Sequence, residues 1–405
     1  MSNISSVSNI TDTPRISDTS LRSTTSITSV NGFSALSKHI GIKKTKLDFG
    51  VIYSDTLCNA AAVYTQNKIK GAPLYVNMEH LKDGKAQAIV INSGIANVCT
   101  GKKGIKDAKT IARLTAKEMN IKETNVLVAS TGLIGCYLPM DKIKKGLVGI
   151  RSVLSKKSKI AEAILTTDKV KKEVLIKKDN FSIGAIAKGA GMIYPNMATM
   201  LAFLCTDAEI QSHSLKKMLK NAVDISFNML AVDMDTSTSD MCIIMANGKA
   251  GKVNEKIFQK ALNEVCIELS KKIACDGEGA TKLIEVHVKS ANNEKCARML
   301  AKSVVSSNLV KCAVYGNDPN WGRILCALGN SKVDFDETKI SVRFENLEIV
   351  KHGVSANFDR KKASEIMNRK NLKIIIEMNC GTASATAYGC DMGTDYIKIN
   401  ACYHT

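Results

Sequence analysis

The residues best suited to chemistry lie near the middle of the chain, where a glycine-rich stretch runs into an apolar strand at Thr199. Gly189 and Gly191 allow positive φ, and Ala198 leaves its own carbonyl unshielded. A threonine hydroxyl can attack the preceding carbonyl, forming an ester that water then hydrolyses. The freed α-amine of Thr199, with a pKa of about 7.7 to 8.0, could then take the hydroxyl proton. The pattern fits self-cleavage, and the alternative is an ordinary threonine at a strand start.

A second segment, Ser130-Thr131-Gly132, could stabilise the oxyanion that forms when a nucleophile attacks an acyl carbon. The loss of one such donor commonly raises the barrier by about 3 to 4 kcal/mol. We expect a strand to end here before a helical segment, which would expose backbone N–H groups and a hydroxyl at one point. A plain helix N-cap followed by a turn is the alternative interpretation.

Other polar side chains could hold a substrate. Glu278 stands between two glycines just before a predicted strand, and it could orient a proton carrier or bind an amine. A turn carboxylate that faces solvent would have the same sequence. Thr166 could supply a hydroxyl, and Lys188 could bind a carboxylate, although it is one of 48 lysines.

The net charge of +19 makes nucleic-acid binding a second hypothesis of a different class. Only nine of the 57 basic residues are arginine, and aromatic residues make up 5% of the chain. Such a protein offers few bidentate phosphate contacts and few platforms for stacked bases. The composition therefore favours a solvated lysine-rich surface, which would still attract an acidic metabolite.

The thirteen cysteines and six histidines are scattered, without a Cys-x-x-Cys pair or a paired histidine spacing. This pattern predicts reduced thiols in the cytoplasm and no metal site. Residues 1–31 are rich in serine and threonine and are expected to form a disordered tail. A transit peptide to the mitochondrial matrix is the minor alternative, because Asp12 and Asp18 offset Arg15 and Arg22.

The candidate site residues must be positioned by the helices and strands that alternate from Gly32 onward. We expect a catalytic domain over 32–290 and a second α/β domain over 291–405 whose C-terminus returns to the active site. Helices are predicted at 106–119, 140–165, 214–229 and 256–272. Strands are predicted at 86–92, 125–130, 181–188, 199–206, 241–246, 282–288, 340–350, 372–378, 383–388 and 396–401.

Taken in order, the distinctive segments of the chain resemble the ornithine acetyltransferase family, also called glutamate N-acetyltransferases or arginine biosynthesis bifunctional proteins. The resemblance begins near Gly32 and covers nearly the whole chain. The segments that carry it are 90–94, 130–132, 166–168, 188–201, 235–238, 276–281, 317–323 and 395–405.

The resemblance implies a precursor cut between Ala198 and Thr199 into α and β chains of 198 and 207 residues. It implies that Thr199 is the nucleophile and that Thr131 and Gly132 form the oxyanion hole. The substrate-binding residues that it implies are Thr166, Lys188, Thr199, Glu278, Asn400 and Thr405. The implied fold is a layered αββα sandwich resembling N-terminal nucleophile hydrolases, within the α/β (α+β) class, with a second smaller α/β domain.

The reaction implied by the resemblance is acetyl transfer from N2-acetyl-L-ornithine to L-glutamate in a ping-pong cycle. No cofactor is implied, and the sequence leaves open whether acetyl-CoA also serves as a donor substrate. The implied assembly is an α2β2 heterotetramer in the cytoplasm, without nucleic acid or membrane. An amidohydrolase or aminopeptidase of similar architecture, in which water accepts the acyl group, is the alternative enzyme.

Overall fold

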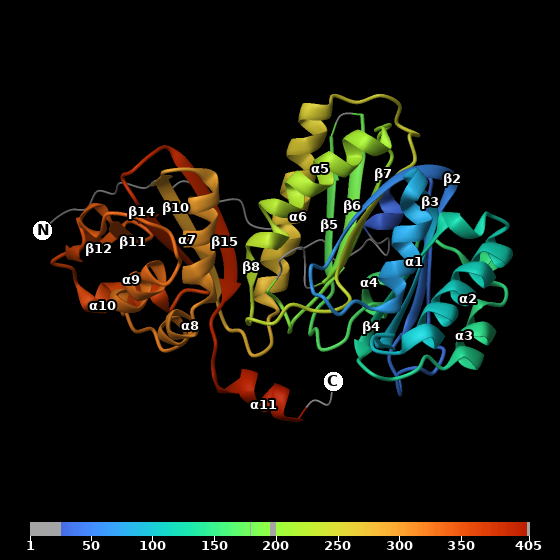
Figure 1. Cartoon of the computed structure of the whole chain (residues 1–405), viewed down its shortest axis with the longest axis horizontal. Coiled ribbons are helices and arrows are strands. Elements are labelled where there is room, and N and C mark those ends of the chain that lie inside the picture. Colours follow the sequence, from blue (N-terminus) through green and yellow to red (C-terminus); the bar gives the residue numbers. More distant parts are fainter. Residues whose placement is uncertain (1–25, 179, 195–199, 403–405) are drawn as a thin grey trace, which may run out of the picture.

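A computed structural model describes residues 26–178, 180–194 and 200–402, which form two β-sheets and their covering helices (Figure 1). The first sheet has the order β4-β3-β2-β9-β7-β6-β5, and β1 pairs with β2. Its strands are β1 Phe33–Lys38, β2 Phe49–Tyr64, β3 Lys85–Ile95, β4 Val126–Leu133, β5 Lys172–Lys177, β6 Ser182–Lys188, β7 Leu201–Thr206 and β9 Met241–Ala246.

The long strand β2 joins two halves of this sheet that pack face to face. Its first part, Phe49 to Tyr53, pairs with β1 and β3, whereas Asn59 to Tyr64 pairs with β9. A register shift between Tyr53 and Cys58 separates the two parts. Apolar side chains of both halves, including Leu127 and Phe203, meet in one core cluster. One continuous hydrogen-bonded sheet therefore supplies both β layers.

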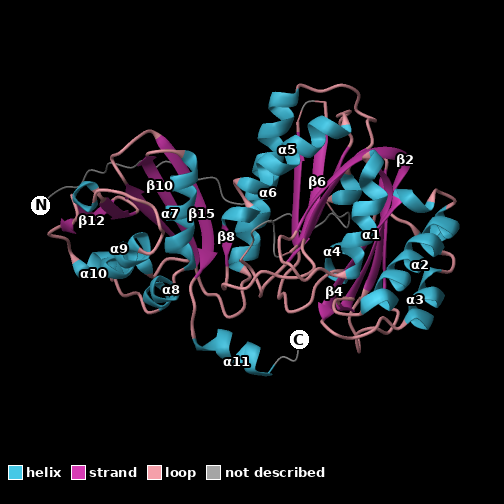
Figure 2. Cartoon of the chain, viewed as in Figure 1, coloured by secondary structure: helices cyan, strands magenta, loops and turns pink. Residues whose placement is uncertain are grey.

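Helices cover the outer face of each layer, because successive side chains of a strand point to opposite faces. Helices α2 Gly101–Met119 and α3 Met140–Leu147 pack on β3 and β4. Helices α5 Ser212–Asp224 and α6 Glu255–Cys275 pack on β6, β7 and β9. The helices and strands thus form the predicted αββα layers (Figure 2). Helices α1 Ala72–His80 and α4 Ile160–Ala163 complete this part.

Local sequence explains where the longest helices begin and end. The side chain of Asn254 caps α6 by accepting hydrogen bonds from the N–H groups of Lys256 and Ile257. Helix α2 ends at Met119 and is followed by Asn120, which adopts the left-handed conformation that asparagine tolerates. The short 3₁₀ turns of the described chain are η1 Ile27–Ser29, η2 Leu81–Asp83, η3 Glu123–Asn125, η4 Ile150–Val153, η5 Phe227–Met229 and η6 Glu337–Lys339.

The second sheet has the order β13-β12-β11-β14-β10-β15-β8 and its own apolar core. Its strands are β8 Leu230–Ala231, β10 Leu283–Ala291, β11 Ser341–Phe344, β12 Leu347–Lys351, β13 Val354–Ser355, β14 Asn371–Glu377 and β15 Ala383–Cys390. Its helices are α7 Glu294–Ser306, α8 Asn308–Tyr315, α9 Trp321–Gly329 and α10 Arg360–Met367. This sheet and its helices form the second unit of the structure, and the first sheet and its helices form the first unit. Because β10 belongs to the second sheet, the second unit includes residues before the expected boundary at 291.

Several expectations need correction. The single strand expected over 340–350 is instead the antiparallel hairpin of β11 and β12, because the chain turns at Glu345, which has a φ of +52°. The expected tail over 1–31 is too long, because Ile27 and Val30 are buried in the core between the layers. The single helix expected over 140–165 is interrupted at Gly149, which has a φ of +68°. The strand expected over 396–401 is instead part of helix α11, Thr394–Cys402. Its apolar alternation resembles a strand, but the segment lies on neither sheet, so a helix satisfies its backbone groups internally.

Helix α11 leaves the second unit after β15 and passes beneath the space between the two units (Figure 1). No residue of α11 is buried. Among the described residues, no helix is both long and apolar enough to cross a bilayer.

Candidate active site

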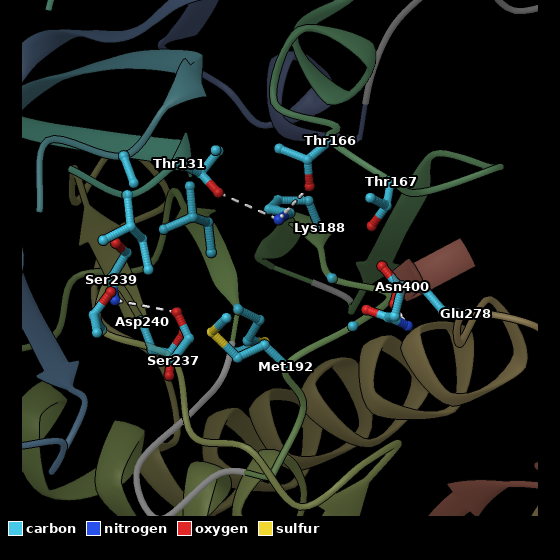
Figure 3. Close-up of a pocket in the computed structure, with 18 residues that line it drawn as sticks. Thr131, Thr166, Thr167, Lys188, Met192, Ser237, Ser239, Asp240, Glu278 and Asn400 are labelled. Atoms are coloured by element: carbon cyan, nitrogen blue, oxygen red, sulfur yellow. Dashed lines mark hydrogen bonds between the residues drawn. The ribbon is translucent and has the colours of Figure 1, made fainter. Parts of the chain in front are cut away.

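A pocket with a volume of about 110 Å³ opens where several strands of the first sheet end (Figure 3). It brings together Thr131 and Gly132 from β4, Lys188 from β6, and Asn400 from α11. The full lining is Ala96, Thr131, Gly132, Ile134, Thr166, Thr167, Lys188, Gly189, Gly191, Met192, Met200, Leu201, Ser237, Thr238, Ser239, Asp240, Glu278 and Asn400.

Lys188 lies at the end of β6 and points toward two threonine hydroxyls (Figure 3). Its Nζ donates to Thr166 Oγ1 at 2.7 Å and to Thr131 Oγ1 at 3.3 Å. Burial lowers the pKa of Lys188, while the Asp168 carboxylate acts in the opposite direction. The Lys188 ammonium therefore brings together Thr131 and Thr166, which lie in separate segments of the sequence.

Thr131 and Gly132 occupy a crowded part of the pocket wall. Gly132 has a φ of +129°, and a Cβ at this position would lie 2.2 Å from the carbonyl carbon of Gly94. Only glycine therefore fits here without moving the backbone of β3. The strand expected to end at Gly132 continues to Leu133, and the following helix, α3, begins only at Met140. Residues 131 and 132 are thus strand residues rather than a helix cap.

Glu278 is buried in the turn after α6, so the solvent-facing alternative is wrong. Its N–H donates to Ala190 O at 2.9 Å, which fixes the turn against the glycine pair. Its Oε2 accepts a hydrogen bond of 2.9 Å from Asn400 Nδ2. Gly191 makes room for this carboxylate, because a Cβ there would lie 2.4 Å from the Glu278 carboxyl carbon.

Asp168, the last residue of the segment 166–168 that carries the resemblance, is a buried carboxylate for which no role was predicted. Its oxygens accept hydrogen bonds from Thr166 N at 3.0 Å and Gly189 N at 2.6 Å. Burial would raise the pKa of Asp168, but Lys188 and Lys172 hold it below its usual value. This carboxylate thus connects Thr166 with the end of β6.

The segment 232–241 holds the chain on both sides of residues 195–199. Asp233 accepts hydrogen bonds from Met192 N at 2.7 Å and Ile193 N at 2.8 Å. On the other side, Met241 N donates to Met200 O at 3.0 Å. Residues 237–240 of the same segment line the pocket, although no residue role was predicted for them. Their sequence signal is the polar run Asp235-Thr236-Ser237-Thr238.

Three predicted site residues, Ala198, Thr199 and Thr405, lie outside the described residues. Met192, Met200 and Leu201 nevertheless line the pocket, so the chain approaches it on either side of 195–199. Of the remaining predicted residues, Thr131, Gly132, Thr166, Lys188, Glu278 and Asn400 all contribute to the lining. The described part of the chain contains no group of three His, Cys, Asp or Glu side chains able to hold a metal ion.

The pocket combines one ammonium group, carboxylates and hydroxyls within a small volume. Lys188 can pair with a carboxylate, and Glu278 or Asp240 can pair with an ammonium group. This arrangement is complementary to a free amino acid, which carries both charges on one carbon.

Comparison with known proteins extends this picture. The ArgJ family model matches residues 34–405. The arginine biosynthesis bifunctional protein ArgJ of Caldanaerobacter subterraneus subsp. tengcongensis is 46% identical over 391 residues, covering 92% of this chain and 97% of that protein. The protein of the same name from Thermotoga neapolitana is 45% identical over 392 residues, covering 92% and 99%.

A solved structure of arginine biosynthesis bifunctional protein ArgJ from Bacillus halodurans is 40% identical, with a TM-score of 0.49. That match covers 50% of this chain and 98% of that chain. Ornithine acetyltransferase from Mycobacterium tuberculosis, solved with ornithine, is 36% identical with a TM-score of 0.42, covering 44% and 98%. The family match spans nearly the whole described chain, and the relatives align over nearly their full length. This chain belongs to the ArgJ family.

Proposed function

We propose that this chain transfers the acetyl group from N2-acetyl-L-ornithine to L-glutamate in arginine biosynthesis. The observation that carries the proposal is the pocket itself, where Lys188, Glu278 and Asn400 surround a space suited to an amino acid. Membership of the ArgJ family supports it, because curated relatives at 45–47% identity are named arginine biosynthesis bifunctional proteins. An acidic amino acid would also be attracted by the net charge of +19.

The first step of the proposal is a cut between Ala198 and Thr199. The Thr199 hydroxyl attacks the Ala198 carbonyl, the peptide C–N bond breaks, and water hydrolyses the resulting ester. The products are a carboxylate at Ala198 and a free amine at Thr199. The hydrogen bonds that hold Met192 and Met200 support this step, since they fix the chain on both sides of the stretch.

The transfer itself then proceeds in two halves. The Thr199 hydroxyl attacks the acetyl carbonyl, and the ornithine α-amine leaves with the proton taken from that hydroxyl. The α-amine of glutamate next attacks the acetyl ester, forming N-acetylglutamate and restoring the hydroxyl. In each half, Thr131 and Gly132 stabilise the oxyanion, a contribution of about 3 to 4 kcal/mol per donor.

Substrate binding in the proposal uses the charges of the pocket. Lys188 binds the α-carboxylate that acetylornithine and glutamate share, with Thr166 beside it. Glu278, oriented by Asn400, binds the amino group of the free amino acid. Thr405 completes the substrate site. One pocket can therefore hold each substrate in turn, as a ping-pong cycle requires.

The proposed working form is an α2β2 heterotetramer in the cytoplasm, with no cofactor. Interstrand hydrogen bonds support continued association of the two fragments, because β6 precedes the cut, β7 follows it, and the two pair over six residues each. Light scattering of the purified protein measures the assembly, and a mass of one α and one β chain would contradict the tetramer.

The deciding experiment combines a denaturing gel, N-terminal sequencing and an acetyl-transfer assay. Wild-type protein is expected to run as two fragments, the second starting at Thr199, and to form N-acetylglutamate from acetylornithine. Thr199→Ala is expected to stay uncut and inactive, while Thr110→Ala should behave like wild type, because Thr110 is a partly exposed threonine on α2 that does not line the pocket. An uncut wild-type chain would rule out the mechanism.

The same assay separates the alternatives. Replacing acetylornithine by acetyl-CoA tests whether both donors are used, which would make the enzyme bifunctional. Omitting glutamate tests whether water accepts the acetyl group instead. Acetate release at an undiminished rate without glutamate would identify a hydrolase and overturn the transferase.

A further inference from the structure

Behind the pocket, the ammonium group of Lys172 is completely buried between two carboxylates. Its Nζ lies 2.7 Å from Asp168 Oδ1 and 2.5 Å from Asp276 Oδ2. All three side chains are nearly inaccessible to solvent, with side-chain exposures of 0%, 0% and 4%. Burial of three charges is costly, and it is tolerated only where each charge is paired and hydrogen-bonded.

Each carboxylate holds a different part of the pocket wall. Asp168 accepts from Gly189 N at 2.6 Å, and Gly189 follows Lys188 in the chain. It also accepts from Thr166 N at 3.0 Å, and the Thr166 hydroxyl accepts from the Lys188 ammonium. Asp276 accepts from Lys169 N at 3.1 Å, and Asp276 is two residues before Glu278 in the same turn. Lys172 therefore connects the Lys188 side of the pocket with the Glu278 side.

We propose that Lys172 is a positioning residue, which sets the separation of Lys188 and Glu278 through Asp168 and Asp276. This proposal rests on the function proposed above. Under this proposal the buried triad of Lys172, Asp168 and Asp276 does more than stabilise the fold. An amino acid carries its carboxylate and its amine at a fixed separation, so the groups that bind them must also lie at a fixed distance.

The place of the proposed cut adds weight to this role. Lys172 and Asp168 precede residue 198, whereas Asp276 follows residue 199. After the cut, no covalent link near the pocket joins the two sides, although the sheet still holds the fragments together. The Lys172 to Asp276 ion pair is then a direct contact between the α and β chains immediately behind the substrate site.

The triad also sets the charge around Lys188. Burial lowers the pKa of the Lys188 ammonium, Asp168 raises it, Lys172 lowers it, and Asp240 and Glu278 raise it. Among the described residues, Lys43 also faces this group and lowers the pKa of Lys188 as a like charge. Removing Lys172 should therefore move the Lys188 pKa up, and removing the Asp168 charge should move it down. Damage to the fold alone would not produce shifts of opposite sign.

The test uses two ligands in calorimetry. Binding of L-glutamate at neutral pH measures affinity for a molecule that carries both the α-carboxylate and the amine. Binding of N-acetyl-L-glutamate from neutral to alkaline pH follows Lys188, because this product has no amine that titrates there. Wild type should lose affinity as Lys188 deprotonates. Lys172→Met should weaken binding roughly tenfold or more and lower kcat by about a hundredfold, since small misplacements are costly. The pH at which affinity falls should move up in Lys172→Met and down in Asp168→Asn.

Lys311→Met is the matched control. Lys311 is equally buried, but its Nζ donates to two backbone carbonyls, Ala231 O at 3.0 Å and Cys390 O at 2.7 Å, and it does not line the pocket. Its variant should lose stability while keeping the wild-type pH dependence of binding. Asp276→Asn, which keeps the side-chain size, decides the matter if Lys172→Met does not fold, and it should also weaken binding.

The outcomes separate the two proposals. Wild-type protein that neither binds N-acetylglutamate nor transfers acetyl groups would overturn the proposed function. Wild-type activity together with unchanged affinity and pH dependence in folded Lys172→Met, or unchanged affinity in Asp276→Asn, would overturn the positioning role alone. Equal pH shifts in Lys172→Met and Lys311→Met would also overturn it.

Discussion

Asn400, on the last helix of the chain, donates a hydrogen bond of 2.9 Å to the carboxylate of Glu278 in the turn after α6. Its amide also donates to Tyr396 O at 3.0 Å within α11. Gly279 allows this approach, because a Cβ there would lie 2.5 Å from Tyr396 N. The exposed C-terminal helix therefore contributes a side chain to the pocket through a few polar contacts rather than through a buried apolar face.

Asn400→Ala should raise KM for glutamate. Loss of a hydrogen bond to a charged group costs about 1.5 kcal/mol, or roughly tenfold in affinity. Steady-state kinetics measure this change. Lys398→Ala on the same helix is the control, since Lys398 is exposed and pairs only with Asp395 among the described residues. An equal rise of KM in both variants would show that α11 acts as a whole and that Asn400 has no particular role.

Gly132→Ala should abolish most of the transferase activity and destabilise the fold. The added Cβ meets the backbone of Gly94, and the positive φ alone costs about 1 to 3 kcal/mol. Thermal unfolding and kcat should be measured together. Gly135→Ala is the matched control, because Gly135 also has positive φ (+81°) but has open space around its Cβ. If the two variants lose the same activity, backbone strain rather than position at the pocket explains the effect.

Gly191→Ala should displace the Glu278 carboxylate, which would lie 2.4 Å from the new Cβ. Because Glu278 is proposed to bind the substrate amine, KM should rise while the fold is retained. Kinetics and circular dichroism test this. Gly329→Ala, where nothing lies within 4 Å of the new Cβ, should leave KM unchanged. A wild-type KM in Gly191→Ala would remove Glu278 from the substrate site.

Lys302 supplies a prediction about pH and stability. Burial lowers its pKa from 10.5 to about 8, and its Nζ lies 4.3 Å from the centre of the Tyr194 ring. Below about pH 8 the folded and unfolded states both carry the charge, and holding it inside costs roughly 3 kcal/mol. Between this pKa and the unfolded value the unfolded state binds more protons, so stability rises with pH.

Below about pH 8, Lys302→Met should therefore have a higher free energy of unfolding than wild type. This difference should shrink as pH rises from about 8 toward 10.5, and denaturant unfolding measures it. The control is Lys332→Met. Lys332 lines the same surface cavity as Lys302 and Tyr194, but its side chain is exposed. Its difference from wild type should stay constant with pH. A constant difference for Lys302→Met as well would show that Lys302 is not desolvated.

Local sequence was sufficient for elements whose pattern agrees with their environment. The strand Met241–Ala246 matches its prediction, because a short and continuous apolar run is typical of a strand in a sheet that is covered on both faces. The helix over 256–272 was nearly right, since its apolar spacing and its Asn254 cap agree. The strand predicted for segment 396–401 was wrong. Its alternation of apolar and polar residues fits a strand, but the segment pairs with no strand of the described chain, and it forms part of helix α11 instead.

The sequence by itself determined the family, the reaction class and the residues that carry the resemblance, because these depend on residue types in a fixed order. The tertiary structure alone decided which of them meet. The return of α11 to Glu278, the contact of Lys188 with Thr131, and the burial of Lys172 between Asp168 and Asp276 all join segments far apart in the chain. Such contacts depend on sheet register and layer packing, which no local pattern encodes.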